Sequence, residues 1–225
     1  ESVSVTVDAS GAEEIYVAAE DYASNAVGYV YDLETLSAAE CPAAILTDVN
    51  KGAWYHEAVD YVRAKDLMEG ETALTFQPQE SATRAQVVSA LYAAAGSPST
   101  SFSAGDLPFT DISAETPYLP ALTWAYGQGI VDGYNENTFG GMASVTRQQL
   151  AVMLRRCAQL YGPVDPAGDL SGFADRSSVA DWARDGLSWA VGEGLIAGRS
   201  SGVLEPQGLT TRAELAQIVM RFVEG

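Results

Sequence analysis

Histidine, cysteine and basic residues are scarce in this sequence. Its 225 residues include one histidine and two cysteines, Cys41 and Cys157, which lack the spacing of a zinc site or of a disulfide framework. Lys and Arg total 12 against 30 Asp and Glu, so the formal net charge is −18. Binding to nucleic acid requires a basic face that neutralises phosphates. We therefore expect no metal, no cofactor and no nucleic-acid partner.

Long apolar runs are also absent. No stretch reaches the ~18–20 apolar residues of a membrane span, so we expect no membrane insertion. Residues 1–45 contain no Lys or Arg, and their stretches "SVSVTV" and "AVGYVYDL" have the pattern of β-strands. We expect this segment to be the β-leaning tail of a preceding domain or an appendage. The start at Glu1 indicates a processed product or an excised fragment.

The remaining sequence repeats itself three times. A Thr-Arg pair recurs with its arginine at 84, 147 and 212, so the period is 63 and then 65 residues. At offsets that agree within one residue, an aspartate, an aromatic residue, a glycine and a large apolar residue stand before each arginine. In that order they are Asp48, Asp111 and Asp175; Trp54, Tyr118 and Trp182; Gly70, Gly133 and Gly198; and Phe76, Phe139 and Leu204.

Each repeat is typical of two helices joined by a loop. We expect first helices at about 53–66, 117–128 and 179–193, with Thr116 as a helix cap and Ser178 in a capping pair. Second helices are expected to begin at the Thr-Arg pairs, which fit the capping box. We expect the motif glycines to supply a positive φ and the large apolar residues to enter the core. Cys157 is expected to be a buried small residue.

One such helix pair is too small to bury its own apolar face, so three are expected to pack together. The fold class that we predict is mainly α: three helix–loop–helix repeats packed as a pseudo-threefold bundle. The predicted domains are the segment 1–45 and repeats at 46–96, 109–162 and 173–225.

The order of these motifs resembles the S-layer homology module from about Leu46 to Gly225. The close matches are "LTDVNKGAWYHEAVDYV" with "SATRAQ" in repeat 1, and "GFADRSSVADWARDGLSWAVGEGLIAG" with "TTRAE" in repeat 3. The resemblance implies a secreted bacterial protein of the cell wall or cell surface. It implies non-covalent anchoring, without catalysis, to a secondary cell-wall polysaccharide attached to peptidoglycan. In this family the polymer commonly carries a pyruvate ketal, and self-association into an S-layer is left open.

The resemblance also implies which residues bind the glycan. They are Arg84, Arg147, Arg212, Asp48, Asp111, Asp175, Trp54, Tyr118, Trp182, Gly70, Gly133 and Gly198. An arginine in the first helical turn is disfavoured by the helix dipole. Binding of a carboxylate by the guanidinium and by the N–H groups of the helix start would offset this cost.

Several alternatives stay open. Each arginine could instead pair with the aspartate of its own repeat as a structural bridge. Grooves could also form between neighbouring repeats, so that the arginine of one acts with the aromatic residue of another. A carbohydrate-active enzyme with paired carboxylates and a helical protein-interaction scaffold are the alternative functions. Tripled carboxylates argue against the enzyme, because an active site is normally unique.

The three repeats are expected to bind unequally. Repeat 3 keeps the tryptophan, the loop proline and the full Thr-Arg-Ala-Glu motif, and Arg199 is expected to be a second donor to an anion. Repeat 2 has Tyr118 and Gly140-Gly141 instead, so its groove is expected to be less preorganised. We therefore expect Arg212→Ala to weaken glycan binding about ten-fold or more, and Arg147→Ala to be mild.

Overall fold

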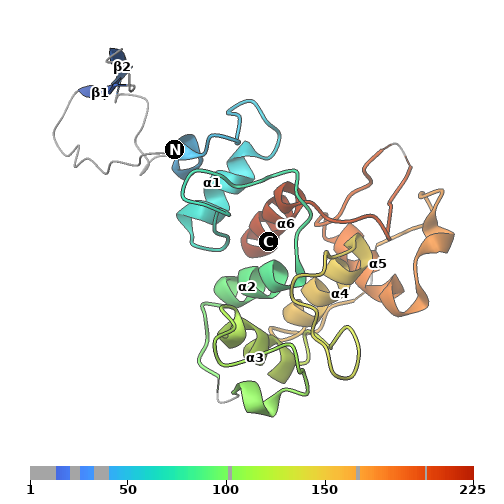
Figure 1. Ribbon diagram of the computed structural model, residues 1–225. Coiled ribbons are helices and arrows are strands. Elements are labelled where there is room, and N and C mark those ends of the chain that lie inside the picture. Colours follow the sequence, from blue (N-terminus) through green and yellow to red (C-terminus); the bar gives the residue numbers. More distant parts are fainter. Residues whose placement is uncertain (1–13, 21–25, 33–40, 101–102, 166–167, 201) are drawn as a thin grey trace.

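The computed structural model is helix-rich and describes residues 14–20, 26–32, 41–100, 103–165, 168–200 and 202–225. Two α-helices lie in each repeat, which confirms the predicted mainly α fold (Figure 1). They are α1 (His56–Ala64), α2 (Arg84–Ala94), α3 (Leu119–Gly127), α4 (Arg147–Ala158), α5 (Arg184–Gly192) and α6 (Arg212–Glu224). Short 3-10 helices cover Pro42–Ile45, Ala104–Asp106, Arg176–Ser178 and Asp181–Ala183.

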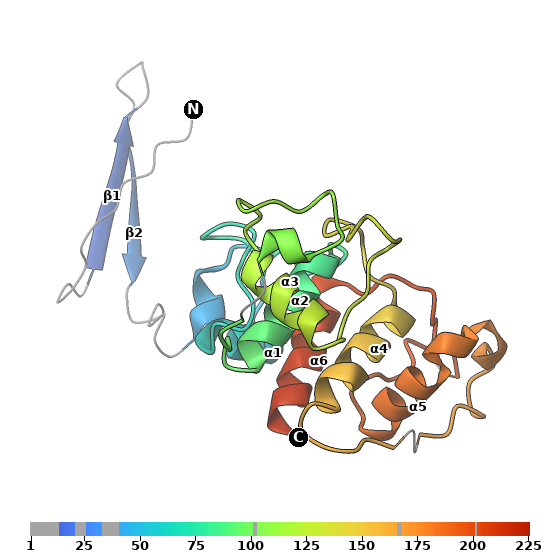
Figure 2. The ribbon, with the colours of Figure 1, turned by 90° about the horizontal axis from the view of Figure 1, so that it is seen from below.

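The first helix of each repeat packs on the second helix of the preceding repeat. α3 packs against α2, α5 against α4, and α1 against α6. The pairing of α1 with α6 joins the first repeat to the last, and the two helices lie near each other in both views (Figures 1 and 2). The three repeats therefore form a closed ring, with α2, α4 and α6 gathered towards its centre.

A ring of backbone hydrogen bonds marks the pseudo-threefold axis. The residue before each capping threonine donates its N–H to the equivalent residue of another repeat. Ala82 donates to the carbonyl of Thr210 at 2.8 Å, Thr210 to Val145 at 2.9 Å, and Val145 to Ala82 at 2.9 Å. These bonds place the starts of α2, α4 and α6 side by side.

The starts of the second helices confirm the sequence prediction. Thr83 with Gln86, Thr146 with Gln149, and Thr211 with Glu214 each form a complete capping box. Each threonine accepts from the backbone N–H three residues on, and that residue's side chain accepts from the threonine N–H. The three loop residues expected in the core, Phe76, Phe139 and Leu204, are fully buried.

The starts of the first helices differ from the prediction. α3 begins at Leu119 without a side-chain cap, and the Thr116 hydroxyl instead accepts from the Ser113 N–H at 3.0 Å. The Ser178 hydroxyl donates to the Asp175 carbonyl at 2.6 Å and caps no helix. Both side chains close turns in the preceding loop, so the predicted caps were wrong.

Near the N-terminus, β1 (Glu14–Glu20) and β2 (Ala26–Asp32) form an antiparallel hairpin in which Glu14 lies opposite Asp32. β2 agrees with the strand predicted in "AVGYVYDL". The strand predicted in "SVSVTV" lies outside the described residues, and β1 was not predicted. In the part of the chain that the structure describes, no helix is both long enough and apolar enough to cross a membrane.

Candidate functional site

The three motif arginines are buried and reach into the next repeat. Each is at most 7% exposed. Arg84 donates from Nε to the carbonyl of Phe139 at 3.0 Å and from Nη2 to that of Asp132 at 2.6 Å. Arg212 makes the same two contacts in repeat 1, with Phe76 and Glu69, each at 2.7 Å.

Arg147 follows the same pattern and contacts the carbonyls of Leu204 and Ala197 in repeat 3. Burial lowers the pKa of all three guanidinium groups, and neighbouring acids oppose this effect. Two backbone carbonyls thus hold each arginine in place, and Nη1 is the nitrogen that they leave available.

The motif aspartates accept hydrogen bonds from their own loops and form no ion pair with the motif arginines. The Asp175 carboxylate accepts the N–H of Leu204 at 2.9 Å and that of Glu205 at 2.7 Å, and these bonds lower its pKa. Asp48 and Asp111 bind the equivalent N–H groups in repeats 1 and 2. The alternative of an arginine–aspartate bridge within each repeat was therefore wrong.

The N–H groups at the helix starts are also occupied. In α2, Arg84 donates its N–H to the carbonyl of Ala143 at 3.0 Å, and Ala85 donates to that of Gly141 at 2.8 Å. The first two N–H groups of α4 and α6 bind loop carbonyls in the same way. An anion at these sites would therefore meet the guanidinium and not the backbone donors, contrary to our expectation.

The motif glycines are required by close packing and not by a positive φ. A Cβ at Gly70 would lie 2.5 Å from the carbonyl oxygen of Thr72, and one at Gly198 would lie 2.9 Å from that of Val203. The positive φ values occur four residues earlier, at Asp66, Gly129 and Gly194. The expected reason for these glycines was wrong, because the turn closes before them and folds the loop back over them.

The motif aromatic residues lie at the surface. Trp54 is 61% exposed and Trp182 is 59% exposed. Tyr118 is partly buried and turns toward its own loop, where a Cβ at Gly141 would collide with its hydroxyl. Repeats 1 and 3 have proline at that loop position, so Gly141 is explained by the space that Tyr118 occupies.

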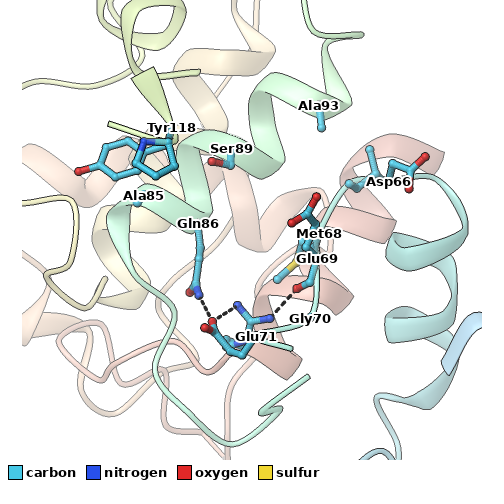
Figure 3. A pocket seen from close by; sticks show the side chains of 13 residues that line it. Asp66, Met68, Glu69, Gly70, Glu71, Ala85, Gln86, Ser89, Ala93 and Tyr118 are labelled. Carbon is cyan, nitrogen blue, oxygen red and sulfur yellow. Dashed lines mark hydrogen bonds and ion pairs between the residues drawn. The ribbon is translucent and has the colours of Figure 1, made fainter. Parts of the chain in front are cut away.

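A groove of about 520 Å³ brings together parts of all three repeats (Figure 3). Arg212 comes from repeat 3, the turn around Gly70 and one face of α2 from repeat 1, and Tyr118 from repeat 2. We call it the first groove. The expectation that grooves lie between neighbouring repeats is confirmed in its geometry.

The equivalent second groove has a volume of about 160 Å³. It combines Arg84 of repeat 1, the turn around Gly133 in repeat 2 and Trp182 of repeat 3. At the corresponding place between repeats 2 and 3, Arg147 contacts Ala197, just before Gly198, and Glu214 at the start of α6. We call this place the third groove. In the first and second grooves the motif arginine, glycine and aromatic residue come from three different repeats.

The residue that follows the motif glycine was singled out from the sequence only in repeat 3, as Arg199, and not in repeats 1 and 2. It is Glu71, which lines the first groove, Tyr134, which follows Gly133 of the second groove, and Arg199, which follows Gly198. Arg199 was expected to be free for an anion, but it binds Glu214 at 2.5 Å and Glu205 at 2.9 Å. The signal was present in the sequence, because this position changes charge from repeat to repeat beside an unchanged glycine.

Neither cysteine forms a disulfide, and within the described residues no group of three His, Cys, Asp or Glu side chains could hold a metal ion. Cys157 lies in the core, as predicted, and burial raises the pKa of its thiol to about 11.

The comparison with known families decides the assignment. The model of the S-layer homology domain matches residues 46–88, 108–151 and 172–216. The chain belongs to the S-layer homology domain family. Domains of this family bind cell-wall polymers and are not catalytic, so this chain is part of a secreted protein anchored at the cell surface.

Several relatives share this S-layer homology region. The surface-layer 125 kDa protein of Lysinibacillus sphaericus is 31% identical over 186 residues, which cover 81% of this chain and 15% of that protein. The amylopullulanase of Thermoanaerobacterium thermosulfurigenes is 26% identical over 175 residues, which cover 77% of this chain and 9% of that enzyme. This chain thus spans a small part of these relatives, and those named as enzymes match it only in the S-layer homology region.

Proposed function

We propose that this chain anchors its protein to the cell wall by binding an anionic secondary polysaccharide, and that the carboxylate of a pyruvate ketal is the group recognised. One observation carries the proposal. In the second groove a buried arginine, held by two backbone carbonyls, lies in the same cavity as an exposed tryptophan.

These two residues suit an acidic sugar. The guanidinium can donate a charge-assisted hydrogen bond to a carboxylate, and it loses little side-chain entropy on binding because it is already held. The flat face of Trp182 can cover the apolar face of a sugar ring. The chain carries a net charge of −18, so recognition of an anion depends on this local positive charge.

The remaining residues that the resemblance implies would act by positioning. Both carboxylate oxygens of each motif aspartate accept N–H groups of the loop, and each motif glycine lets that loop pack closely. We propose that they shape the grooves, while the arginines and aromatic rings contact the ligand.

Co-sedimentation with isolated cell-wall sacculi tests the proposal. We expect the chain to pellet with sacculi that carry their secondary polymer, and to stay in solution with sacculi from which the polymer has been removed chemically. Enzymatic or chemical removal of the pyruvate alone should also abolish pelleting. Equal binding to bare peptidoglycan would overturn the proposal.

A further inference from the structure

The three grooves share one plan but differ at two positions close to the motif arginine. The first is the residue after the motif glycine: Glu71, Tyr134 or Arg199. The second is the third residue of the second helix: Gln86, Gln149 or Glu214. The difference in these side chains gives each arginine different charges around it.

In the first groove an internal carboxylate occupies the arginine. Oε1 of Glu71 lies 3.1 Å from Nη1 of Arg212 and accepts a hydrogen bond from Nε2 of Gln86 at 2.6 Å (Figure 3). Asp66 and Glu69 line the same cavity. A ligand carboxylate would have to displace Glu71 and would then face three acidic side chains, so this groove is poorly suited to an anion.

In the third groove the corresponding charges bind one another. Arg199 binds Glu214 through Nε at 2.7 Å and through Nη2 at 2.5 Å. Oε1 of Glu214 also lies 3.6 Å from Nη1 of Arg147. An anion would have to break this network before it reached Arg147.

In the second groove no carboxylate lies within ion-pair distance of the motif arginine among the described residues, although the nearby Asp132 charge acts on Arg84. Tyr134 and Gln149 are neutral, and among the described residues Arg84 forms no ion pair, whereas Arg147 and Arg212 each form one. Arg156 adds a second positive charge to the lining and is paired with Asp132 at 2.8 Å. The only carboxylate that lines this cavity is therefore already bound to Arg156.

We propose that this chain has one groove open to an acidic sugar, the second groove, and that the residue after the motif glycine sets this selectivity. The other two sites are occupied by the chain's own side chains. Glu71 occupies the first groove, and Arg199 paired with Glu214 occupies the third. This inference rests on the proposed function. It replaces the ranking by motif completeness, which put Arg212 first, with one that puts Arg84 first, because the first and second grooves each draw their parts from three repeats.

Calorimetric titration of the full chain with a sugar that bears a pyruvate ketal tests the inference. We expect one binding site in the wild type. Trp182→Ala should weaken binding about ten-fold or more. Trp54→Ala is the matched control, because this ring holds the same motif position in repeat 1 and is 61% exposed against 59% for Trp182, and its effect should stay within about two-fold.

Two substitutions of the residue that follows the motif glycine complete the test. Tyr134→Glu copies Glu71 into the second groove and should weaken binding about ten-fold or more, because its carboxylate occupies Arg84. Glu71→Gln should release Arg212 and raise the stoichiometry from one site to two. Tyr134 is 64% exposed, so Tyr134→Glu should leave the melting temperature unchanged.

The outcomes separate the two proposals. If the wild type binds the sugar but Trp54→Ala is as damaging as Trp182→Ala, or Tyr134→Glu binds normally, the groove assignment is overturned while anchoring stands. If the wild type binds neither the sugar nor polymer-bearing sacculi, the proposed function fails and this inference fails with it.

Discussion

Thr210 lies on the pseudo-threefold axis, fully buried, and among the described residues its hydroxyl has no hydrogen-bond partner. Repeats 1 and 2 place Ala82 and Val145 at this position. A buried polar group without a partner costs about 1–3 kcal/mol, so we expect Thr210→Val to raise the free energy of unfolding by about 1 kcal/mol. Urea denaturation measures this change. Thr210→Ser keeps the hydroxyl and should not stabilise, and a valine variant less stable than the wild type would contradict the interpretation.

At the same scale, the spacing of the repeats predicted which residues have a structural role, but it did not always predict what that role is. Phe76, Phe139 and Leu204 were predicted to be buried because an apolar residue at a fixed place in a loop has few other uses. The partner of Arg84 could not be predicted, because its side chain contacts Asp132 and Phe139 in the next repeat. A repeated pattern gives equivalent positions and does not say which copies touch.

Each loop depends on one aspartate, and this dependence should appear as sensitivity to acid. The N–H groups of Leu204 and Glu205 hold the pKa of Asp175 below its ordinary value. A carboxyl whose pKa is lowered by folding contributes stability above its unfolded pKa, and that stability is lost as the pH falls through the folded pKa. We therefore expect this contribution to begin to fall below about pH 4, the ordinary pKa of an aspartate, and to be lost as the pH falls further through the lowered pKa of Asp175.

Urea midpoints at pH 7 and pH 3 check this expectation. Asp175→Asn should be less stable than the wild type at pH 7, because an amide has one oxygen for two N–H donors. Its midpoint should also change less between the two pH values. Asp165→Asn, at an exposed position, is the control and should behave like the wild type. The same pH dependence in Asp175→Asn and the wild type would show that the loop does not depend on this ionisation.

The helices themselves were predictable to different degrees. α2, α4 and α6 begin where the sequence places them, because a capping box is a contact between residues three apart. α1, α3 and α5 begin without side-chain caps. Their starts follow from packing against another repeat, and local capping signals such as Thr116 carry no information about that packing.

The arrangement of the whole molecule follows from where the repeats meet. Three repeats and a pseudo-threefold body were predictable from the period and from the small size of one helix pair. The pairing of α1 with α6 was not, although it brings Arg212 of repeat 3 into a groove with residues of repeats 1 and 2. Which residues share a site is thus a property of the closed ring and not of any single repeat.

A closed ring should unfold as one unit. Phe76 is fully buried in repeat 1, and its carbonyl accepts from Arg212 of repeat 3. Phe76→Ala should lower the free energy of unfolding by about 3–5 kcal/mol. Fluorine NMR of fluorotryptophan-labelled protein reports on Trp189 in repeat 3, and circular dichroism reports on all helices. Both signals should move to the same lower urea midpoint, as in a two-state transition.

Leu204→Ala is the matched substitution in repeat 3, because Leu204 is equally buried and its carbonyl accepts from Arg147 of repeat 2. It should shift both signals together in the same way. In an open stack of repeats, damage at one end can leave the other end folded. If Phe76→Ala lowers the helical midpoint but leaves the Trp189 transition at its wild-type position, repeats 1 and 3 are not coupled. The contact of α1 with α6 would then contribute too little free energy to make repeats 1 and 3 unfold together.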